Sequence, residues 1–305
     1  MIGTNSKFSK ALSFFNNKSN QGNENLNLHM FKEDLYQGIM PIGARTDYHP
    51  EFQVKLEGKN SDYNKVMNLL KSMTRRSHGS VSEQVCDFVE SIGFNLVQNG
   101  QAFFEIVRGE DESASYYLNS FTSEPILKLH SYYIQYIPKK FNVKKRVVFM
   151  HRDKVWKVRM VEELGGVKGF KKTLDDLEIH DPLGPYFLKE NLSSFKKYSF
   201  NLSEYFLKLD IYIQRTTRKF GWDKRGDSHK TEFYFVYQKV KMAWAKALLR
   251  IHIISELNYL FQSLDIDCKI IVSGIPEPKD LLSTLQKLHE GKISFQEAMD
   301  MTVLL

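Results

Sequence analysis

The sequence predicts an α+β fold: a helix joined to an antiparallel β wing, then long stem-like helices and a small C-terminal helical region. Three observations support this fold class. An apolar stripe of helical period covers residues 81–98 and leads directly into the strand-like run "QAFFEIVR". Further strand-like runs, separated by turn residues, continue to residue 161. No Gly or Pro occurs from Thr231 to Leu264, which predicts one long helix.

These patterns divide the chain into four expected parts. Residues 1–50 are expected to be a mobile N-terminal arm and loops, and residues 51–195 an α+β core and wing. Residues 196–266 form the stem-like helices, and residues 267–305 the small C-terminal helical region. The arm is rich in Asn and Ser, as mobile segments often are. The arm also contains the apolar residues Phe8, Leu12, Phe14 and Phe15. They form either a short amphipathic anchor or part of a disordered tail, and both interpretations stay open.

Capping signals place the first helices. Residues 61–76 carry apolar side chains at helical spacing, and a second helix follows over residues 81–98. Ser80 precedes Glu83 by three positions, which is the capping-box pattern. Asn99-Gly100 supplies the stop, since both residues tolerate a positive φ.

The strand after Gly100 is expected to have two different faces. Ala102, Phe104 and Ile106 point to one side, and Phe103, Glu105 and Val107 point to the other. A return strand and three further runs, the last two joined by a tight turn at "MHRDK", complete one largely antiparallel sheet over residues 101–161. Glu105 is interpreted as a structural residue paired with a cation, because no second acid lies at a catalytic spacing.

The rest of the chain is mainly helical. "ELGGVKGF" is expected to be a loop, followed by a helix that begins near Asn201. "GWDKRGDSHK" separates this helix from the long one over residues 231–264. A short strand in "DCKIIVSGIP", a helix in "PKDLLSTLQKLHEG" and a second one capped by Ser294 and Glu297 follow.

Composition is that of an ordinary globular protein, with 42% hydrophobic and 26% charged residues. Charge interrupts every long apolar run before about 20 residues, so no membrane contact is expected, and no secretory signal is present. Cys86 and Cys268 are expected to be buried hydrophobes rather than a disulfide, which favours a reducing compartment.

Positive charge is concentrated in the middle of the chain. The net charge is +7 overall. Residues 139–173 hold 12 basic against 3 acidic side chains, a net of +9, and residues 189–250 hold 14 against 6, a net of +8. Polyanions are therefore the expected partners.

No catalytic motif is convincing. His151–Asp153 matches the "HRD" triplet of protein kinases, but Val158 stands where the kinase motif has Asn, so a turn is expected. His180-Asp181 is likewise expected to be a turn. Phosphate-binding loops, dinucleotide fingerprints, zinc-protease motifs and histidine clusters are absent from the sequence. We therefore expect no catalytic residue, no metal and no cofactor.

The basic side chains in and beside the long helices are the candidate phosphate contacts. Phe220 and Trp222 lie among them, and Trp222 is expected to be a buried anchor rather than a stacking platform for bases. The candidates are Arg215, Arg218, Lys219, Lys224, Arg225, Lys230, Lys239, Lys241, Lys246 and Arg250.

Two stretches resemble a known family. "LVQNGQAFFEIVRG" followed by a hairpin and "YIQYIP" is similar to the core of tailed-bacteriophage portal proteins. The family's closing rhythm L-x-x-G-x-I-S-x-x-E-A is matched by Leu288, Gly291, Ile293, Ser294, Glu297 and Ala298. The resemblance covers residues 61–138 and 231–301. The chain is short for a portal, and the segment where a clip domain should lie is barely longer than "GWDKRGDSHKTE", so the clip is either minimal or replaced by another protein.

The resemblance implies a non-enzymatic homo-oligomeric ring at a capsid vertex, the head–tail connector. Such a ring forms the channel through which double-stranded DNA is packaged and ejected. The implied partners are further copies of the chain, double-stranded DNA without sequence specificity, and capsid, terminase and neck or adaptor proteins. The implied location is the virion, after assembly in the host cytoplasm.

Two alternatives remain open at the level of sequence. The first is a non-catalytic nucleic-acid-binding accessory protein, monomeric or dimeric, that uses the basic region 139–250. The second is a hydrolytic enzyme, for example a nuclease, built on four acids that otherwise form a solvated helix face and a turn: Asp175, Asp176, Glu178 and Asp181.

Overall fold

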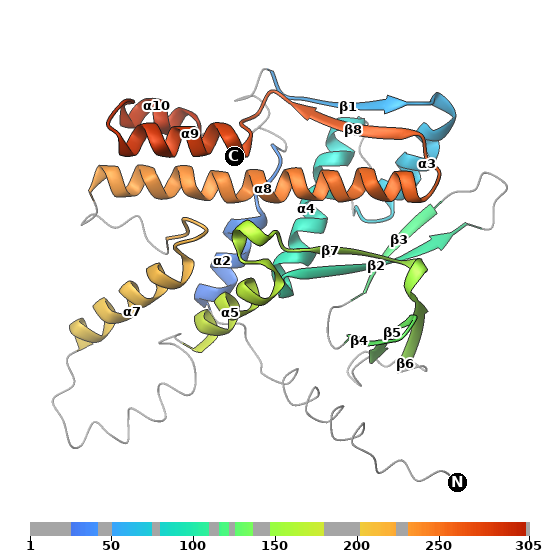
Figure 1. The fold of residues 1–305 in the computed structure, drawn as a ribbon, viewed down its shortest axis with the longest axis horizontal. Coiled ribbons are helices and arrows are strands. Elements are labelled where there is room, and N and C mark those ends of the chain that lie inside the picture. The colour runs from blue at the N-terminus through green and yellow to red at the C-terminus, as the bar shows by residue number, and fades with distance from the viewer. Residues whose placement is uncertain are drawn as a thin grey trace, which may run out of the picture.

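The computed structural model describes residues 26–41, 51–74, 80–109, 116–121, 126–136, 147–179, 202–223 and 231–302. Within them the fold is α+β, as predicted, and is arranged around one long helix (Figure 1). This helix, α8 (Glu232–Ser263), is 32 residues long. Thr231 caps it, since its side chain accepts a hydrogen bond from the Tyr234 amide. The prediction of one long helix is confirmed.

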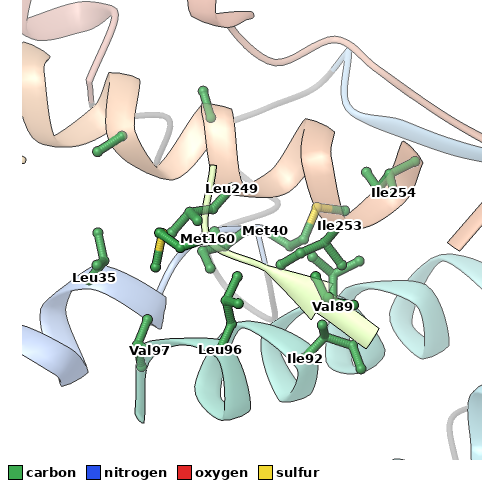
Figure 2. Close-up of a cluster of buried hydrophobic side chains, with 14 of the residues drawn as sticks. Leu35, Met40, Val89, Ile92, Leu96, Val97, Met160, Leu249, Ile253 and Ile254 are labelled. Carbon is green, nitrogen blue, oxygen red and sulfur yellow. The ribbon is translucent and has the colours of Figure 1, made fainter. Parts of the chain in front are cut away.

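The core forms where α4 (Val81–Asn99) crosses α8. Figure 2 shows Val89, Ile92 and Leu96 of α4 facing Leu249 and Ile253 of α8. All five of these side chains are fully buried. The core also includes α2 (Leu26–Tyr36) through Phe31 and Leu35. The expected arm and loops of residues 1–50 therefore include a core helix, while Phe8, Leu12, Phe14 and Phe15 lie outside the described residues.

The junction between α4 and the following strand is built as the sequence predicts. The Ser80 side chain accepts a hydrogen bond from the Glu83 amide at the start of α4. At its end Gly100 adopts a left-handed conformation with φ 71°, and its amide donates to the Leu96 carbonyl over 2.8 Å. The Gly100 carbonyl accepts from the Met160 amide at 2.8 Å. The backbone N–H and C=O of Gly100 are therefore both hydrogen-bonded, which fixes the turn between α4 and the following strand.

The predicted single sheet over residues 101–161 is instead two three-stranded antiparallel sheets. The hinge sheet has the order β3-β2-β7, with β2 spanning Gln101–Arg108, β3 spanning Tyr116–Phe121 and β7 spanning Val155–Arg159. The outer sheet has the order β4-β5-β6, with β4 spanning Ile126–Leu129, β5 spanning Tyr132–Tyr136 and β6 spanning Val147–His151.

The division arises because β7 pairs with β2 rather than with its neighbour in sequence, β6. A 3₁₀ turn, η3 (Arg152–Lys154), joins these two strands. The "HRD" triplet is therefore a turn, as predicted, but it connects two sheets instead of closing a hairpin.

The two faces of β2 are confirmed. Ala102 and Phe104 belong to the core shared with the helices. On the opposite face Phe103 is also buried, and its ring lies 5.5 Å from that of Tyr133 in β5. Phe103 therefore joins the hinge sheet to the outer sheet.

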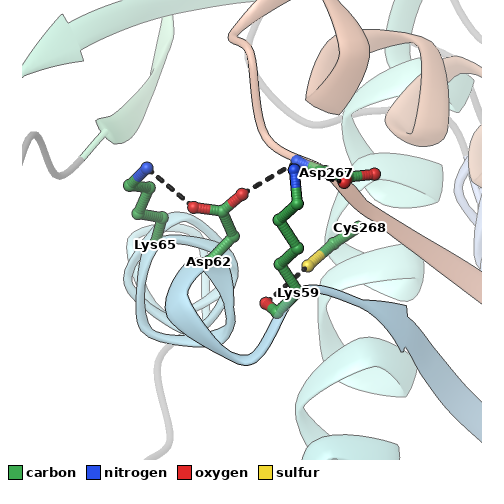
Figure 3. A network of polar contacts seen from close by, with 5 residues as sticks. All are labelled: Lys59, Asp62, Lys65, Asp267 and Cys268. Carbon is green, nitrogen blue, oxygen red and sulfur yellow. Dashed lines mark hydrogen bonds and ion pairs between the residues drawn. The ribbon is translucent and has the colours of Figure 1, made fainter.

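A two-stranded antiparallel sheet links distant parts of the chain. β1 (Gln53–Gly58) pairs with β8 (Cys268–Ser273), next to α3 (Asn60–Lys71). Figure 3 shows the polar contacts at its end. Asp62 accepts hydrogen bonds from Lys65 Nζ at 2.7 Å and from the Asp267 amide at 3.0 Å. These hydrogen bonds lower the pKa of Asp62.

The remaining helices include one correction. α5 (Gly166–Ile179) begins inside "ELGGVKGF", which was expected to be a loop, directly after the 3₁₀ turn η4 (Glu162–Leu164). Its buried Phe170 and Leu174 offset the weak helix propensity of the glycines. α7 (Leu202–Thr217), α9 (Pro278–His289) and α10 (Phe295–Asp300) follow. The Ser294–Glu297 capping box of α10 is confirmed.

Candidate nucleic-acid interface

The end of α7 presents three of the predicted basic side chains. Arg215, Arg218 and Lys219 are all exposed. The Thr217 hydroxyl lies 2.8 Å from the Ile213 carbonyl oxygen and 3.0 Å from the Trp222 carbonyl oxygen. Thr217 thereby fixes the path of the chain as it leaves the helix.

Two aromatic residues anchor the segment after α7. Phe220 and Trp222 are buried, and their rings lie 5.1 and 5.5 Å from that of Phe31 in α2. The Trp222 indole N–H donates to Asp34 Oδ2 over 2.7 Å. Trp222 is thus a buried anchor, as predicted, and its ring is covered by protein rather than open to a base.

Gly221 brings this segment against α8. Its φ is +67°, and a Cβ atom there would lie 2.6 Å from the Gln238 carbonyl oxygen. The close approach places Arg218 near Lys241. Burial, and after it the charge of Arg218, lowers the pKa of Lys241.

We call Arg215, Arg218, Lys219 and Lys241 the α7–α8 basic patch. Lys219 Nζ lies against Gly165, in the turn before α5. Lys241 Nζ stands 4.8 Å from the centre of the Trp244 ring. The patch therefore combines side chains from two helices and from the turn after α7, and the buried Phe220 and Trp222 anchor that turn.

The other lysines of α8 lie on a different side of the helix. Lys239 and Lys246 are seven residues apart, so they share a face, whereas Lys241 is turned about 200° from Lys239. Lys239 is exposed and Lys246 is half-buried. Lys224, Arg225 and Lys230 lie outside the described residues.

Arg250 is not a surface residue. It is only 2% exposed, and its guanidinium donates to the carbonyl oxygens of Ile39, at 3.4 Å, and of Pro276. Burial lowers its pKa to about 10. Arg250 holds the segment after α2 and the turn before α9 against α8, so it is not a candidate phosphate contact.

The acids of the nuclease alternative are placed on the surface of α5. Asp175 and Glu178 are exposed and Asp176 is half-buried, while Asp181 lies outside the described residues. Within the part of the chain that the structure describes, no three His, Cys, Asp or Glu side chains are grouped to hold a metal ion. Nor is any described helix both long and apolar enough for a bilayer crossing.

Glu105 lies half-buried on β2, between Asn119 and Val155 of the neighbouring strands. The expected pairing with a cation is not found among the described residues, where no ion pair involves it. Both cysteines are buried and free, as predicted, and burial raises the pKa of Cys86 to about 12.

No protein-family model matches the chain, and neither does any curated protein. One chain of a solved structure described as "Neck of empty GTA particle computed with C6 symmetry" aligns over 92% of this chain and 95% of its own length. The identity is 10% and the TM-score is 0.43.

Proposed function

We propose that this chain is a structural, non-enzymatic subunit of the head–tail connector of a tailed-phage-like particle, and specifically a portal protein. In this role copies of the chain form a ring at a capsid vertex and surround double-stranded DNA. Capsid, terminase and neck or adaptor proteins are its proposed neighbours, and the virion is its proposed location, after assembly in the host cytoplasm.

One observation carries the proposal. The two portal-like stretches lie far apart in sequence, but they pack on the same long helix. α4, which leads into the hinge strand β2, crosses α8, while α9 and α10 lie alongside its N-terminal half (Figure 1). Gly291, with φ 66°, makes the turn between α9 and α10. In the portal-like order, α4, the hinge sheet, α8 and the closing helices thus share one connected hydrophobic core.

Exposed apolar side chains favour assembly with other chains. On α7, Leu207 is 61% exposed and Ile211 is 40% exposed, one helical turn apart. The outer sheet exposes Leu129 and Phe149 at 63% and 64%. Apolar residues gathered in this way commonly mark protein–protein contact surfaces.

The accessory-protein alternative also has an observation in its favour. Arg215, Arg218 and Lys239 are exposed on a single chain, so phosphate contact through them does not require a ring. A portal protein forms a ring of many copies, whereas the accessory protein is a monomer or a dimer. The number of chains in the assembly therefore distinguishes the two functions.

Light scattering of the purified full-length chain separates the two functions. The portal proposal predicts a mass many times the 35.7 kDa of one chain, unchanged over a tenfold dilution. A mass of one or two chains, with duplex DNA bound, would favour the accessory protein.

A further inference from the structure

A second group of basic side chains lies where the two sheets meet, away from the α7–α8 basic patch. Lys157 and Arg159 belong to β7, Lys128 to β4 and Arg152 to the η3 turn. Lys128, Arg152 and Arg159 are exposed, and Lys157 is half-buried. We call these four residues the sheet-joint cluster.

Strand register explains why they converge. Lys157 and Arg159 stand two residues apart on one face of the hinge sheet, opposite Phe103 and Gln101 of β2. Lys128 pairs with Tyr133 across the outer sheet. Because the Tyr133 ring contacts Phe103, this pairing brings Lys128 toward Lys157. Arg152 lies in the turn that links the two sheets.

The electrostatics of Lys157 agree with this geometry. Its Nζ lies 4.7 Å from the centre of the Phe103 ring. Burial, and after it the charges of Arg159, Lys128 and Arg152, lowers the pKa of Lys157 to about 8. The charges of Arg159, Lys128 and Arg152 thus act unfavourably on the Lys157 amine in the free protein, and a bound anion of high charge density would offset that repulsion.

Two carboxylates among the described residues lie near the cluster. Glu105 is two residues from Phe103 on the same face of β2, at the edge of the group. Asp153 follows Arg152, and its Oδ2 lies 3.2 Å from His151 Nδ1. Neither acid is among the charges that act on Lys157.

We infer that the sheet-joint cluster binds the phosphate backbone of a nucleic acid without reading its sequence. A DNA duplex carries one negative charge per ~1.7 Å of helix axis. An extended acidic peptide carries at most one charge per ~3.3 Å of its length. The higher charge density of the duplex therefore makes it the better ligand for a cluster of four cations. Phe103, the ring beside Lys157 Nζ, is only 3% exposed and is therefore closed to base stacking. Binding therefore rests on phosphate contacts.

The inference goes beyond the portal proposal and does not depend on it. Phosphate contact at the sheet joint can be measured whatever the assembly state, so failure to form a ring and failure of this site are separate results.

The test is binding of a fluorescein-labelled 30-bp duplex to the full chain, followed by fluorescence anisotropy between 50 and 200 mM NaCl. The site variant combines Lys128→Gln, Arg152→Gln and Arg159→Gln, all at exposed positions. The matched control carries Lys55→Gln, Lys269→Gln and Lys287→Gln, which remove the same charge from exposed positions on β1, β8 and α9. Circular dichroism melting checks that both variants fold, and single substitutions replace any triple variant that does not.

We expect the site variant to reduce the magnitude of the negative slope of log affinity against log salt by about 2 to 3, and to lower the affinity at 100 mM NaCl by at least about tenfold. The control should change the slope by less than about 1. An Arg215→Gln, Arg218→Gln variant, measured in parallel, separates the contribution of the α7–α8 basic patch.

Equal losses in the site variant and the control would overturn the inference, as would no binding by the parent chain at 50 mM NaCl. Polyglutamate that competes as well as duplex at equal charge would also overturn it, and would assign the cluster to an acidic protein partner instead.

Discussion

At the scale of single residues, Arg250 is a buried cation with a structural role, unlike the exposed basic residues that are candidate phosphate contacts. Arg250→Ala removes two hydrogen bonds and leaves the carbonyls of Ile39 and Pro276 without their donor. We expect the free energy of unfolding to fall by about 3 kcal/mol. Urea denaturation measures this, with Lys239→Ala as the exposed control, expected to stay within about 0.5 kcal/mol. An equal loss of unfolding free energy in Arg250→Ala and Lys239→Ala would show that the buried hydrogen bonds of Arg250 do not stabilise the fold.

The lowered pKa of Lys157 predicts how the stability of the folded chain depends on pH. Because its pKa is lowered to about 8, the charged amine destabilises the folded chain below pH 8, and this penalty is relieved as pH rises from about 8 toward 10.5. Arg159, Lys128, Arg152, Glu105 and Tyr133 are the ionisable groups around it. We expect the stability of the parent chain to rise relative to Lys157→Gln over this range.

The Lys157 pKa itself can be followed by ¹³C NMR of the lysine side chains, assigned with Lys157→Gln. If the sheet-joint cluster binds phosphate, saturating duplex should raise this pKa, because a nearby anion favours the charged amine. A pKa that stays the same with and without duplex would contradict that contact.

At the scale of elements, two glycines with the same backbone conformation provide a matched pair. Gly221 has φ +67° and Gly291 has φ +66°, but a Cβ at Gly221 would meet α8 whereas at Gly291 it would meet nothing within 4 Å. Both alanine variants should lose about 1 kcal/mol from the strained φ. Gly221→Ala should lose clearly more, because the segment after α7 must move away from α8.

Chemical denaturation of the two variants gives the comparison directly. Duplex binding adds a second measurement, since displacement of this segment would separate Arg218 from Lys241. Equal stabilities for Gly221→Ala and Gly291→Ala would rule out the tight contact between the segment and α8.

Asp62 connects three further elements, because it ties α3 to the chain between α8 and β8. Its pKa is lowered from the usual 3.8, so the stability it contributes is present above that pH and is lost as pH falls through the lowered value. Asp62→Asn should therefore be less stable than the parent near pH 7. The difference should shrink below pH 4, and acid unfolding curves of the two proteins measure it.

Local signals predict most of the helices and several strands, but they do not predict α2, the start of α5 or all of the strand pairing. Ser80 and Gly100 mark the ends of α4 correctly, since capping depends on neighbouring residues. The pairing of β1 with β8 joins Val54 to Val272, and no local pattern specifies a contact over that separation. The same limit explains the two sheets, because which strand pairs with β2 is decided by packing.

At the scale of the whole molecule, the sequence located the positive charge but not its exposure. Lys239 and Arg250 both lie on α8 in the basic region, yet one is exposed and the other is buried under the turn before α9. α8 is surrounded by other elements along much of its length, so the position of a residue on the helix does not reveal what covers it. The sheet-joint cluster has a related explanation: Arg152, Lys157 and Arg159 lie in the basic region 139–173, but only the strand register brings them together with Lys128.

Negative-stain electron microscopy of the purified full-length chain tests the central claim, a ring of copies around DNA, most directly. The proposal predicts closed rings of one fixed number of subunits, each with a central opening, in which duplex DNA is enclosed. Particles of one or two chains, with or without duplex and at every concentration tried, would contradict it.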